Sequence, residues 1–291
     1  MKNIFLLLTL VIISCNKEKA VNKYLTESIP NDTPLPYNIE LIPEGKLIHS
    51  GIFSPDLSEY FFTISDKNFQ QFDVLISRKQ KGKWSIPTEV FFNTKNNEHG
   101  TSFSPDGKYI YFSSTRPVNI DGVSTTWHIW RSKRNGDHWT DPEFVDIPNL
   151  HDKLVSHPSI TTDGTLYFHA GNTDYSDLFI YCSKMKNEKY SEAIKLPGEI
   201  NFDTKQNTPY ISPDGSYLLF ESSPNLYISY SDKMGNWSAA KPLNEKINRH
   251  GKGNPFITPD QKYLFFVAGL EPTPEEKWSL FWVSTKSVFS N

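Results

Sequence analysis

The sequence of 291 residues predicts an all-β fold, a β-propeller of five four-stranded blades. A short phrase occurs five times: two or three apolar or small residues, a Ser/Thr-Pro-Asp or Thr-Thr-Asp-Gly turn, and an aromatic strand. Strand-like runs with their own turn signals follow each copy. The phrase aspartates are 50, 57, 51 and 46 residues apart, a period typical of propeller blades. They are Asp56, Asp106, Asp163, Asp214 and Asp260.

Each phrase predicts a tight turn between the first two strands of a blade. Proline presets φ, aspartate bonds the backbone ahead of it, and glycine permits a positive φ. In the second copy, Pro105-Asp106-Gly107 joins a short strand over 101–104 to an aromatic strand over 108–113.

A third and a fourth strand are expected in each unit. The third strands are rich in aromatic and β-branched residues, as half-buried strands should be. They are expected at 73–77, 128–132, 177–183, 225–231 and 279–284. In the first four units a turn and an aromatic residue then lead to a fourth strand, which completes a blade. The aromatic residues are Trp84, Trp139, Tyr190 and Trp237.

The chain ends determine the number of blades. Only seven residues follow Ser284, so the fifth unit lacks its fourth strand. A strand-like run over 37–42 aligns with the fourth-strand position, and we expect it to complete the last blade and remove exposed sheet edges. A sixth blade would need a further unit, and the polar stretch 15–37 is too short to supply one.

The phrases resemble the WD40-like, TolB-type propeller repeat, and Asp106-Gly107-Lys108-Tyr109 is the nearest match. The resemblance covers about residues 38–285. Copies one and five have Leu57 and Gln261 in place of glycine, and copy three has Thr162 in place of proline. The resemblance implies partner binding in the cell envelope; the family itself has six blades. The resemblance is specific evidence for the fold and weak evidence for any activity, because propellers host many functions.

The N-terminus predicts export. A basic start, an apolar run over 4–13 and Ser14-Cys15 form a secretory signal, and ten residues are too few to span a bilayer as a helix. The segment also resembles a bacterial lipoprotein signal, which implies cleavage before Cys15 and acylation of its thiol. An ordinary signal with an incidental cysteine is the alternative. We expect a signal peptide over 1–14, a disordered tether over 15–36 and the propeller over 37–291. The protein would then be lipid-anchored in the bacterial envelope, at the outer membrane, facing the periplasm or the cell surface.

Composition limits the partners. The formal net charge of −3 and the lack of Lys/Arg runs predict no nucleic-acid binding. The expected partners are an envelope protein, a peptide or a glycan, and no cofactor is expected. If Cys15 is acylated, Cys182 has no cysteine to pair with, and its apolar strand predicts a buried, inert thiol.

The best candidate site is the mouth of the propeller channel, where the inner strands begin. Aligning the copies on the phrase aspartate gives a first level and a second level of equivalent residues. The first level is His49, His99, Ser156, Asn207 and Gly253, and the second is Ser50, Gly100, His157, Thr208 and Asn254. Gln206, Arg249, His250 and Glu98 lie just upstream. Convergent polar groups in a concavity are typical of ligand sites. The residues proposed to bind a ligand are His49, His99, His157, Asn207, Asn254, His250 and Glu98.

Two alternatives remain for these positions. Strand entries are often polar simply because they cap backbone groups. Histidines from different blades could also converge on a metal, but no local spacing such as His-x-x-x-His supports this, and no metal is expected.

Arg116 and Glu221 follow second strands and could contact a ligand, a neighbouring blade or solvent. The segment 171–177 carries oxygen ligands but lacks the spacing of a calcium loop.

The sequence supports three classes of function. The first is a non-catalytic binding or scaffold lipoprotein, because no Gly-x-Ser-x-Gly elbow, phosphate loop or dinucleotide fingerprint is present. The second is a carbohydrate-active enzyme, a glycoside hydrolase or lyase acting at the channel mouth. The third is a peptidase-like propeller whose catalytic partner is another chain. Two facing carboxylates about 5–10 Å apart would favour the glycosidase; a mouth of His, Asn and aromatic residues would favour binding.

Overall fold

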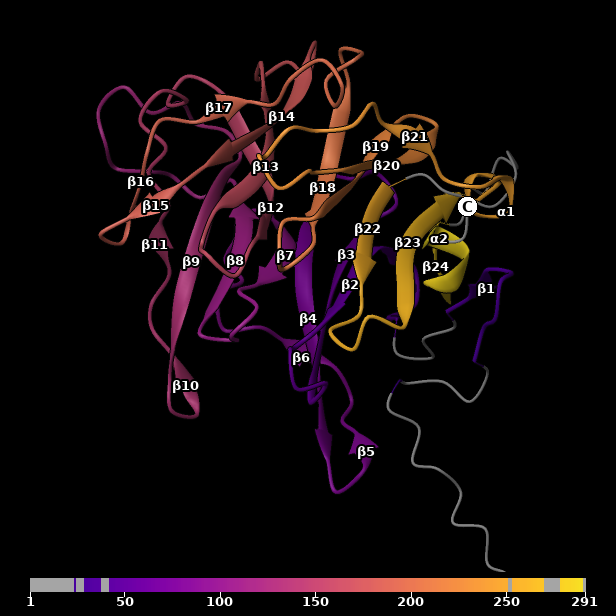
Figure 1. The fold of residues 1–291 in the computed structure, drawn as a ribbon. Helices are drawn as coiled ribbons and strands as arrows, with labels where there is room; N and C mark the ends of the chain where they lie inside the picture. Colours follow the sequence, from indigo (N-terminus) through magenta and orange to yellow (C-terminus); the bar gives the residue numbers. More distant parts are fainter. Residues whose placement is uncertain (1–23, 25–28, 38–41, 251–252, 270–277, 290–291) are drawn as a thin grey trace, which may run out of the picture.

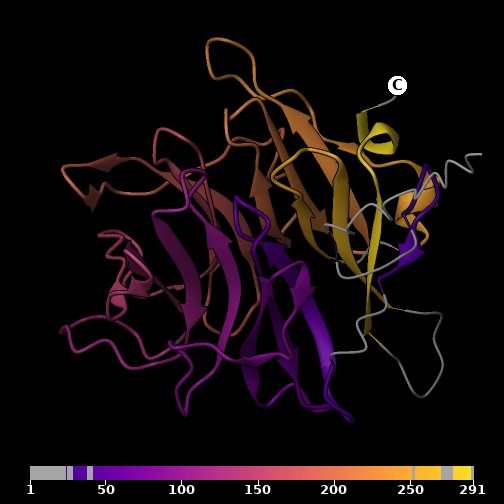
Figure 2. The same cartoon turned by 90° about the horizontal axis from the view of Figure 1, so that it is seen from below.

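The computed structural model describes residues 24, 29–37, 42–250, 253–269 and 278–289. The predicted signal segment and Cys15 lie outside these residues. In the described chain, five antiparallel sheets of four or five strands are arranged in a ring, and a two-stranded sheet is attached to the third of them. Figure 1 and Figure 2 show this ring. The predicted fold, a five-bladed β-propeller, is confirmed. None of the helices in this part of the chain is long and apolar enough to cross a membrane.

Each blade has an inner strand at the channel and three strands outside it. The inner strands are β2 (Leu47–Phe53), β7 (Glu98–Phe103), β12 (Leu154–Ile160), β18 (Gln206–Ile211) and β22 (Gly253–Ile257). The second strands are β3 (Glu59–Ser65), β8 (Tyr109–Ser114), β13 (Leu166–Gly171), β19 (Tyr217–Ser222) and β23 (Tyr263–Gly269). The third strands are β4 (Phe72–Gln80), β9 (His128–Asn135), β14 (Leu178–Ser183), β20 (Asn225–Tyr230) and β24 (Trp278–Ser284).

The outer strands are only two residues long. They are β6 (Thr88–Glu89), β11 (Glu143–Phe144), β17 (Ile194–Lys195), β21 (Lys241–Pro242) and β1 (Leu35–Pro36). Short pairings extend the first three blades through β5 (Lys83–Trp84), β10 (His138–Trp139), β15 (Met185–Lys186) and β16 (Lys189–Tyr190). Two single-turn helices follow, α1 (Glu245–Asn248) and α2 (Lys286–Phe289).

The phrase aspartates form the expected turns. In the second blade, Ser104 Oγ donates to Asp106 Oδ1 at 2.7 Å, and the backbone N–H of Lys108 donates to the same oxygen at 3.0 Å. Leu57 (φ 59°) and Gln261 (φ 60°), which replace the glycine of the other copies, still have a left-handed backbone. The aspartates are therefore explained by turn geometry. The end of the propeller that carries these turns is called the turn face below, and the opposite end, where the inner strands begin, the mouth face.

Hydrophobic packing between neighbouring blades stabilises the ring. A cluster of buried apolar side chains fills each of the five seams in the described chain. Aromatic rings make up much of these clusters. For example, Phe92 stacks on Phe112 across the seam of blades one and two, with ring centroids 4.0 Å apart. Aromatic pairs add to the free energy of area burial, so these seams hold the inner strands at fixed positions around the channel.

An N-terminal strand completes the last blade, as predicted, but it lies earlier in the chain than expected. β1 pairs antiparallel with β24 through Leu35 and Trp282, and the N–H of Tyr37 continues the ladder to the carbonyl of Leu280 at 2.7 Å. In Figure 1 the indigo β1 lies beside β24. Of the strand expected over 37–42, the described residues are Tyr37, which takes part, and Ile42, which does not; residues 38–41 lie outside the described chain.

Part of the segment expected to be a tether also lies against the propeller. Tyr24 is buried, with an exposed fraction of 4%. Its ring packs edge-on against Phe53 and Tyr263, and its hydroxyl donates to Asp260 Oδ2 at 2.7 Å. Asp260 belongs to the fifth phrase, so Tyr24 attaches the N-terminal segment to the turn face, at the seam of the first and last blades.

Candidate functional site

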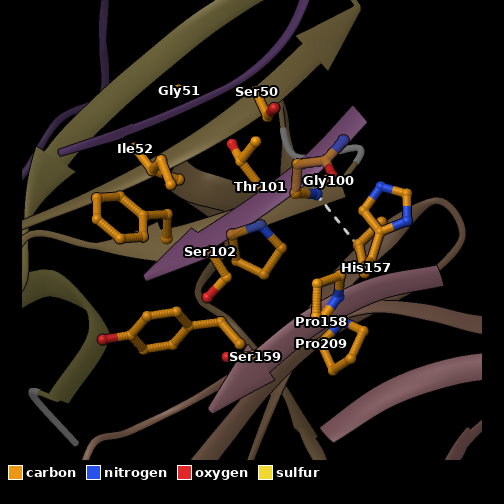
Figure 3. Close-up of a pocket in the computed structure, with 15 residues that line it drawn as sticks. Ser50, Gly51, Ile52, Gly100, Thr101, Ser102, His157, Pro158, Ser159 and Pro209 are labelled. Carbon is orange, nitrogen blue, oxygen red and sulfur yellow. Dashed lines mark hydrogen bonds between the residues drawn. The ribbon is translucent and has the colours of Figure 1, made fainter. Parts of the chain in front are cut away.

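A β-bulge near the start of every inner strand forms a ring in the channel. The register shifts in β2, β7, β12, β18 and β22, always next to the predicted second level. Four residues of this level have a left-handed backbone: Gly100 (φ 59°), His157 (φ 56°), Thr208 (φ 47°) and Asn254 (φ 52°). Such a φ is unusual for a β-branched threonine and costs conformational energy. Figure 3 shows Ser50, Gly100 and His157 of this ring from three neighbouring strands.

Prolines follow the ring in three blades: Pro158, Pro209 and Pro255. Because the inner strand is a sheet edge, a proline there removes a backbone N–H that no neighbouring strand would accept. The left-handed residue and the proline after it bend the inner strand and change the direction of its side chains relative to the channel. This explains why side chains at the second level lie at the border between the mouth and the deeper channel.

The ring separates two spaces of very different size. On the mouth face lies a pocket of about 390 Å³, called the mouth pocket. A second space of only about 40 Å³ is lined by the ring residues together with Ile52, Tyr210, Phe256 and the three prolines. Figure 3 labels Ile52, Pro158 and Pro209 of this lining. The mouth pocket is lined by His49, Ser50, Thr63, Phe69, Phe72, His99, Gly100, Trp127, Leu154, Ser156, His157, His169, Tyr175, Leu178, Asn207, Thr208 and Asn254.

Four histidines lie side by side in the mouth pocket. The ring centroids of His99 and His157 are 4.4 Å apart, and those of His157 and His169 are 4.9 Å apart. The imidazole of His49 contacts Ser65 Oγ at 2.7 Å. Ser156 Oγ lies 3.0 Å from His99 Nε2 and 3.1 Å from His157 Nδ1. Hydroxyls from the inner and second strands thus hold three of the imidazoles, and the backbone N–H of Thr208 donates to His169 Nδ1 at 3.2 Å.

Burial keeps these histidines uncharged. It lowers the pKa of His49 to about 4 and that of His157 to about 4. Burial, with the neighbouring imidazole of His157, also holds the pKa values of His99 and His169 well below their usual range. At neutral pH each imidazole offers one donor and one acceptor and no charge.

The structure brings together five of the seven predicted ligand-binding residues and places two elsewhere. His49, His99, His157, Asn207 and Asn254 line the mouth pocket. Glu98 and His250 are not among its lining residues.

Glu98 and His250 have structural contacts instead. The carboxylate of Glu98 is fully buried and pairs with Arg116 Nη2 at 3.0 Å. The His250 ring stacks on Phe281 with centroids 5.0 Å apart. For Glu98 the reason is strand geometry, because alternate residues of β7 point to opposite faces. His250 lies in the turn after α1, before β22 begins.

Sequence reasoning gave too little weight to the aromatic side of the pocket and missed His169. Phe72, Trp127 and Tyr175 lie at or near the starts of third strands, and the loops from second to third strands reach the mouth face because successive strands are antiparallel. That rule could have found them. His169 was identifiable only through its register opposite Ser156 in β13.

The weaker candidates are largely explained by local structure. Arg116 belongs to the Glu98 pair. In the segment 171–177, Asp177 Oδ1 accepts from the N–H of Asn172 at 2.8 Å, as in a polar turn. Cys182 is half-buried, and burial raises the pKa of its thiol. Glu221 Oε2 lies 3.5 Å from Thr208 Oγ1, beside the mouth pocket. Within the described chain, no group of three His, Cys, Asp or Glu side chains is placed to hold a metal ion.

Comparison with known proteins supports the fold. No protein-family model matches the sequence, and no curated protein matches it. Among solved structures, an exo-β-1,3-galactanase from Clostridium thermocellum is 14% identical with a TM-score of 0.54, and the match covers 88% of this chain and 62% of that one.

Two further solved structures are less similar. An oligogalacturonate lyase in complex with manganese is 12% identical over 84% of this chain and 66% of that one, with a TM-score of 0.42. A chain of a nidogen/laminin complex is 15% identical, with a TM-score of 0.48, and the match covers 77% of this chain and 73% of that one. The chain thus spans less than two thirds of the lyase and galactanase chains. The galactanase likeness is one of fold alone.

Proposed function

We propose that this protein is a non-catalytic binding protein of the bacterial cell envelope, lipid-anchored through Cys15, whose propeller binds a protein, peptide or glycan partner at the mouth pocket. One observation carries the proposal. The described lining combines neutral imidazoles, amides, hydroxyls and aromatic rings, and it contains no Asp, Glu, Lys or Arg. A concave, mostly apolar site with a few convergent polar groups is typical of ligand binding.

The same lining argues against catalysis. A glycosidase needs two carboxylates around the sugar, and Glu221 beside Thr208 is a single carboxylate. The Ser156–His99 contact resembles a nucleophile with its base. However, burial holds the pKa of His99 well below the neutral range, which makes its imidazole a poor proton acceptor. The carbohydrate-active enzyme is therefore the less favoured reading.

Binding without turnover can be tested directly. The purified propeller is titrated by calorimetry with a panel of envelope oligosaccharides, peptidoglycan fragments and short peptides, and each ligand is then analysed by mass spectrometry. We expect one class to bind and to be recovered unchanged. His157→Asn, which suits the left-handed backbone, should weaken binding at least about tenfold, as for a central contact residue. His138→Ala, on the exposed hairpin β10, should bind normally. Turnover of the ligand, or binding indifferent to His157→Asn, would reject the proposal.

The lipid anchor has its own test. The full chain is expressed in a bacterial host, and membranes are separated from the soluble fraction. We expect the mature protein in the membrane fraction with an acylated N-terminal Cys15, because acyl chains partition into bilayers. Cys15→Ser should abolish the acylation and release the protein, whereas Cys182→Ser should leave it bound. An unacylated Cys15, or membrane retention of the Cys15→Ser protein, would contradict the anchor and leave the binding proposal intact.

A further inference from the structure

One side of the mouth pocket is a continuous wall of aromatic rings. The aromatic wall consists of Phe69, Phe72, Trp127 and Tyr175. Phe72 begins β4, and the other three lie in the second-to-third-strand connections of blades one, two and three. The ring centroids of Phe72 and Trp127 are 6.2 Å apart, and Trp127 Nε1 donates to the Tyr175 hydroxyl at 2.8 Å. Phe69 and Phe72 are neighbours at 6.4 Å. The wall therefore crosses two blade seams.

The backbone at two positions of the wall is strained. Phe69 (φ 57°) and Tyr175 (φ 58°) have left-handed conformations, which bulky residues rarely adopt. Their loops hold them there: the N–H groups of Phe69 and Tyr175 donate to the carbonyls of Asp66 and Asn172. Both rings remain partly exposed, 42% and 49%. Strain retained at a pocket rim is a reason to infer a ligand contact, because glycine would form the same turn more easily.

The ring at the inner end of the pocket offers uncharged hydrogen-bonding groups. Asn207 Oδ1 is buried and accepts no hydrogen bond from any residue that the structure describes. A buried acceptor of this kind calls for a donor. Asn254, Thr208 and His157 lie on the same ring, and amide, hydroxyl and neutral imidazole groups all both donate and accept. A sugar hydroxyl also does both.

The channel narrows at the inner end of the mouth pocket. The space between the ring residues and those just after them is about 40 Å³, against about 390 Å³ for the mouth pocket. A ligand that fills the mouth pocket therefore stops at this narrowing. A polymer would have to present an end rather than an interior segment.

We propose that the mouth pocket binds the end of an uncharged glycan chain, with a sugar ring against the aromatic wall and its hydroxyls on Asn207, Asn254 and His157. This rests on the proposed binding function of the pocket. A peptide end carries an ammonium or a carboxylate group. The described lining has no Asp or Glu to pair with the ammonium and no Lys or Arg to pair with the carboxylate. Glu221, beside Thr208, disfavours acidic sugars. The aromatic faces carry partial negative charge and suit the C–H groups of a sugar ring.

The test uses neutral oligosaccharides of two to six hexose units, matching oligosaccharides that contain uronic acids, and tetrapeptides with free or capped ends. Calorimetry is expected to show binding of a neutral oligosaccharide and little or no binding of its acidic counterpart or of the peptides. Affinity should stop rising after the first few units, and a cyclic form of the same sugar should lose at least about tenfold, because it has no end. Preferred binding of a peptide or an acidic sugar, or equal affinity for the cyclic form, would overturn the inference.

Variants of the aromatic wall show whether a loss of binding comes from lost stacking on the sugar or from a folding defect. Trp127→Ala should weaken binding at least about tenfold, as for an aromatic anchor, and Trp127→Phe should restore most of it. Trp139→Ala, in the outer hairpin β10, is the matched control and should bind normally. Unchanged affinity in a folded Trp127→Ala protein would overturn the inference. If a peptide binds without turnover and depends on His157, this inference fails while the proposed function stands. If the sugar is cleaved, the proposed function fails.

Discussion

Replacing Glu98 with alanine is expected to lower the free energy of unfolding by about 3–5 kcal/mol, because it leaves the buried charge of Arg116 without a partner. The carboxylate of Glu98 is fully buried, and the side chain of Arg116 is 13% exposed. Oε1 of Glu98 also accepts from Ser114 Oγ at 2.8 Å and Thr94 Oγ1 at 2.9 Å. Urea denaturation measured by fluorescence would give the change.

A second substitution distinguishes a buried charge pair from simple loss of packing. Glu98→Gln should destabilise the propeller, and adding Arg116→Met should recover part of the loss, since removing both charges costs less than stranding one. Glu89→Ala, at an exposed position of β6, should change the stability by less than about 0.5 kcal/mol. A Glu98→Ala protein as stable as the Glu89→Ala protein would show that the pair contributes nothing.

Acid is expected to destabilise the propeller steeply between pH 6.5 and pH 4. The native state keeps His49 and His157 neutral down to about pH 4, whereas an unfolded histidine takes up a proton near its ordinary value of 6.5. The unfolded state therefore binds more protons in this window, and stability is full above it and falls as the pH falls. Each such histidine contributes up to about 1.4 kcal/mol per pH unit, and His99 and His169 act in the same direction.

The histidine effect can be isolated from that of the carboxyl groups. Hydrogen bonds from Ser216 and Ser212 lower the pKa of Asp214 from its usual 3.8, so its contribution is lost at lower pH. Urea midpoints at pH 7.5, 6.0 and 4.5 should fall for the native sequence and fall less for His157→Asn. His138→Gln, at an exposed position, should follow the native sequence. Equal midpoints at all three pH values would show that the histidines are not held neutral.

The fold was predictable because the repeated turns are local and the ring is periodic. Proline, aspartate and glycine determine a turn within five residues, and five copies at similar spacing leave few other architectures. The repeated blade geometry even overrides the backbone preference of single residues. Leu57 and Gln261 adopt the left-handed conformation that glycine has in the other turns. The same alignment of copies predicted that His49, His99 and His157 would share one end of the channel.

What sequence reasoning could not supply came from contacts between distant segments. The closing strand was predicted over 37–42 because that run aligns with the fourth-strand position, but Leu35 and Pro36 form it, with ladder partners at Trp282 and Phe281. Tyr24 lies in a polar stretch, and its burial depends on distant partners: the rings of Phe53 and Tyr263, and Asp260, 236 residues away. The aromatic wall was not predicted as a unit because irregular loops carry most of it, and loops have no period.

Tyr24 also determines how far the propeller can move from its proposed anchor. Eight residues lie between Cys15 and Tyr24, and the nine Cα-to-Cα steps of an extended chain span at most about 32 Å. A tether free up to residue 36 would span more than twice as much and allow the propeller to tumble. With Tyr24 fixed on the turn face, a lipid on Cys15 would keep that face toward its own membrane. The mouth pocket, at the opposite end, would then sample the aqueous space or the layer beyond it, and its ligands would come from there.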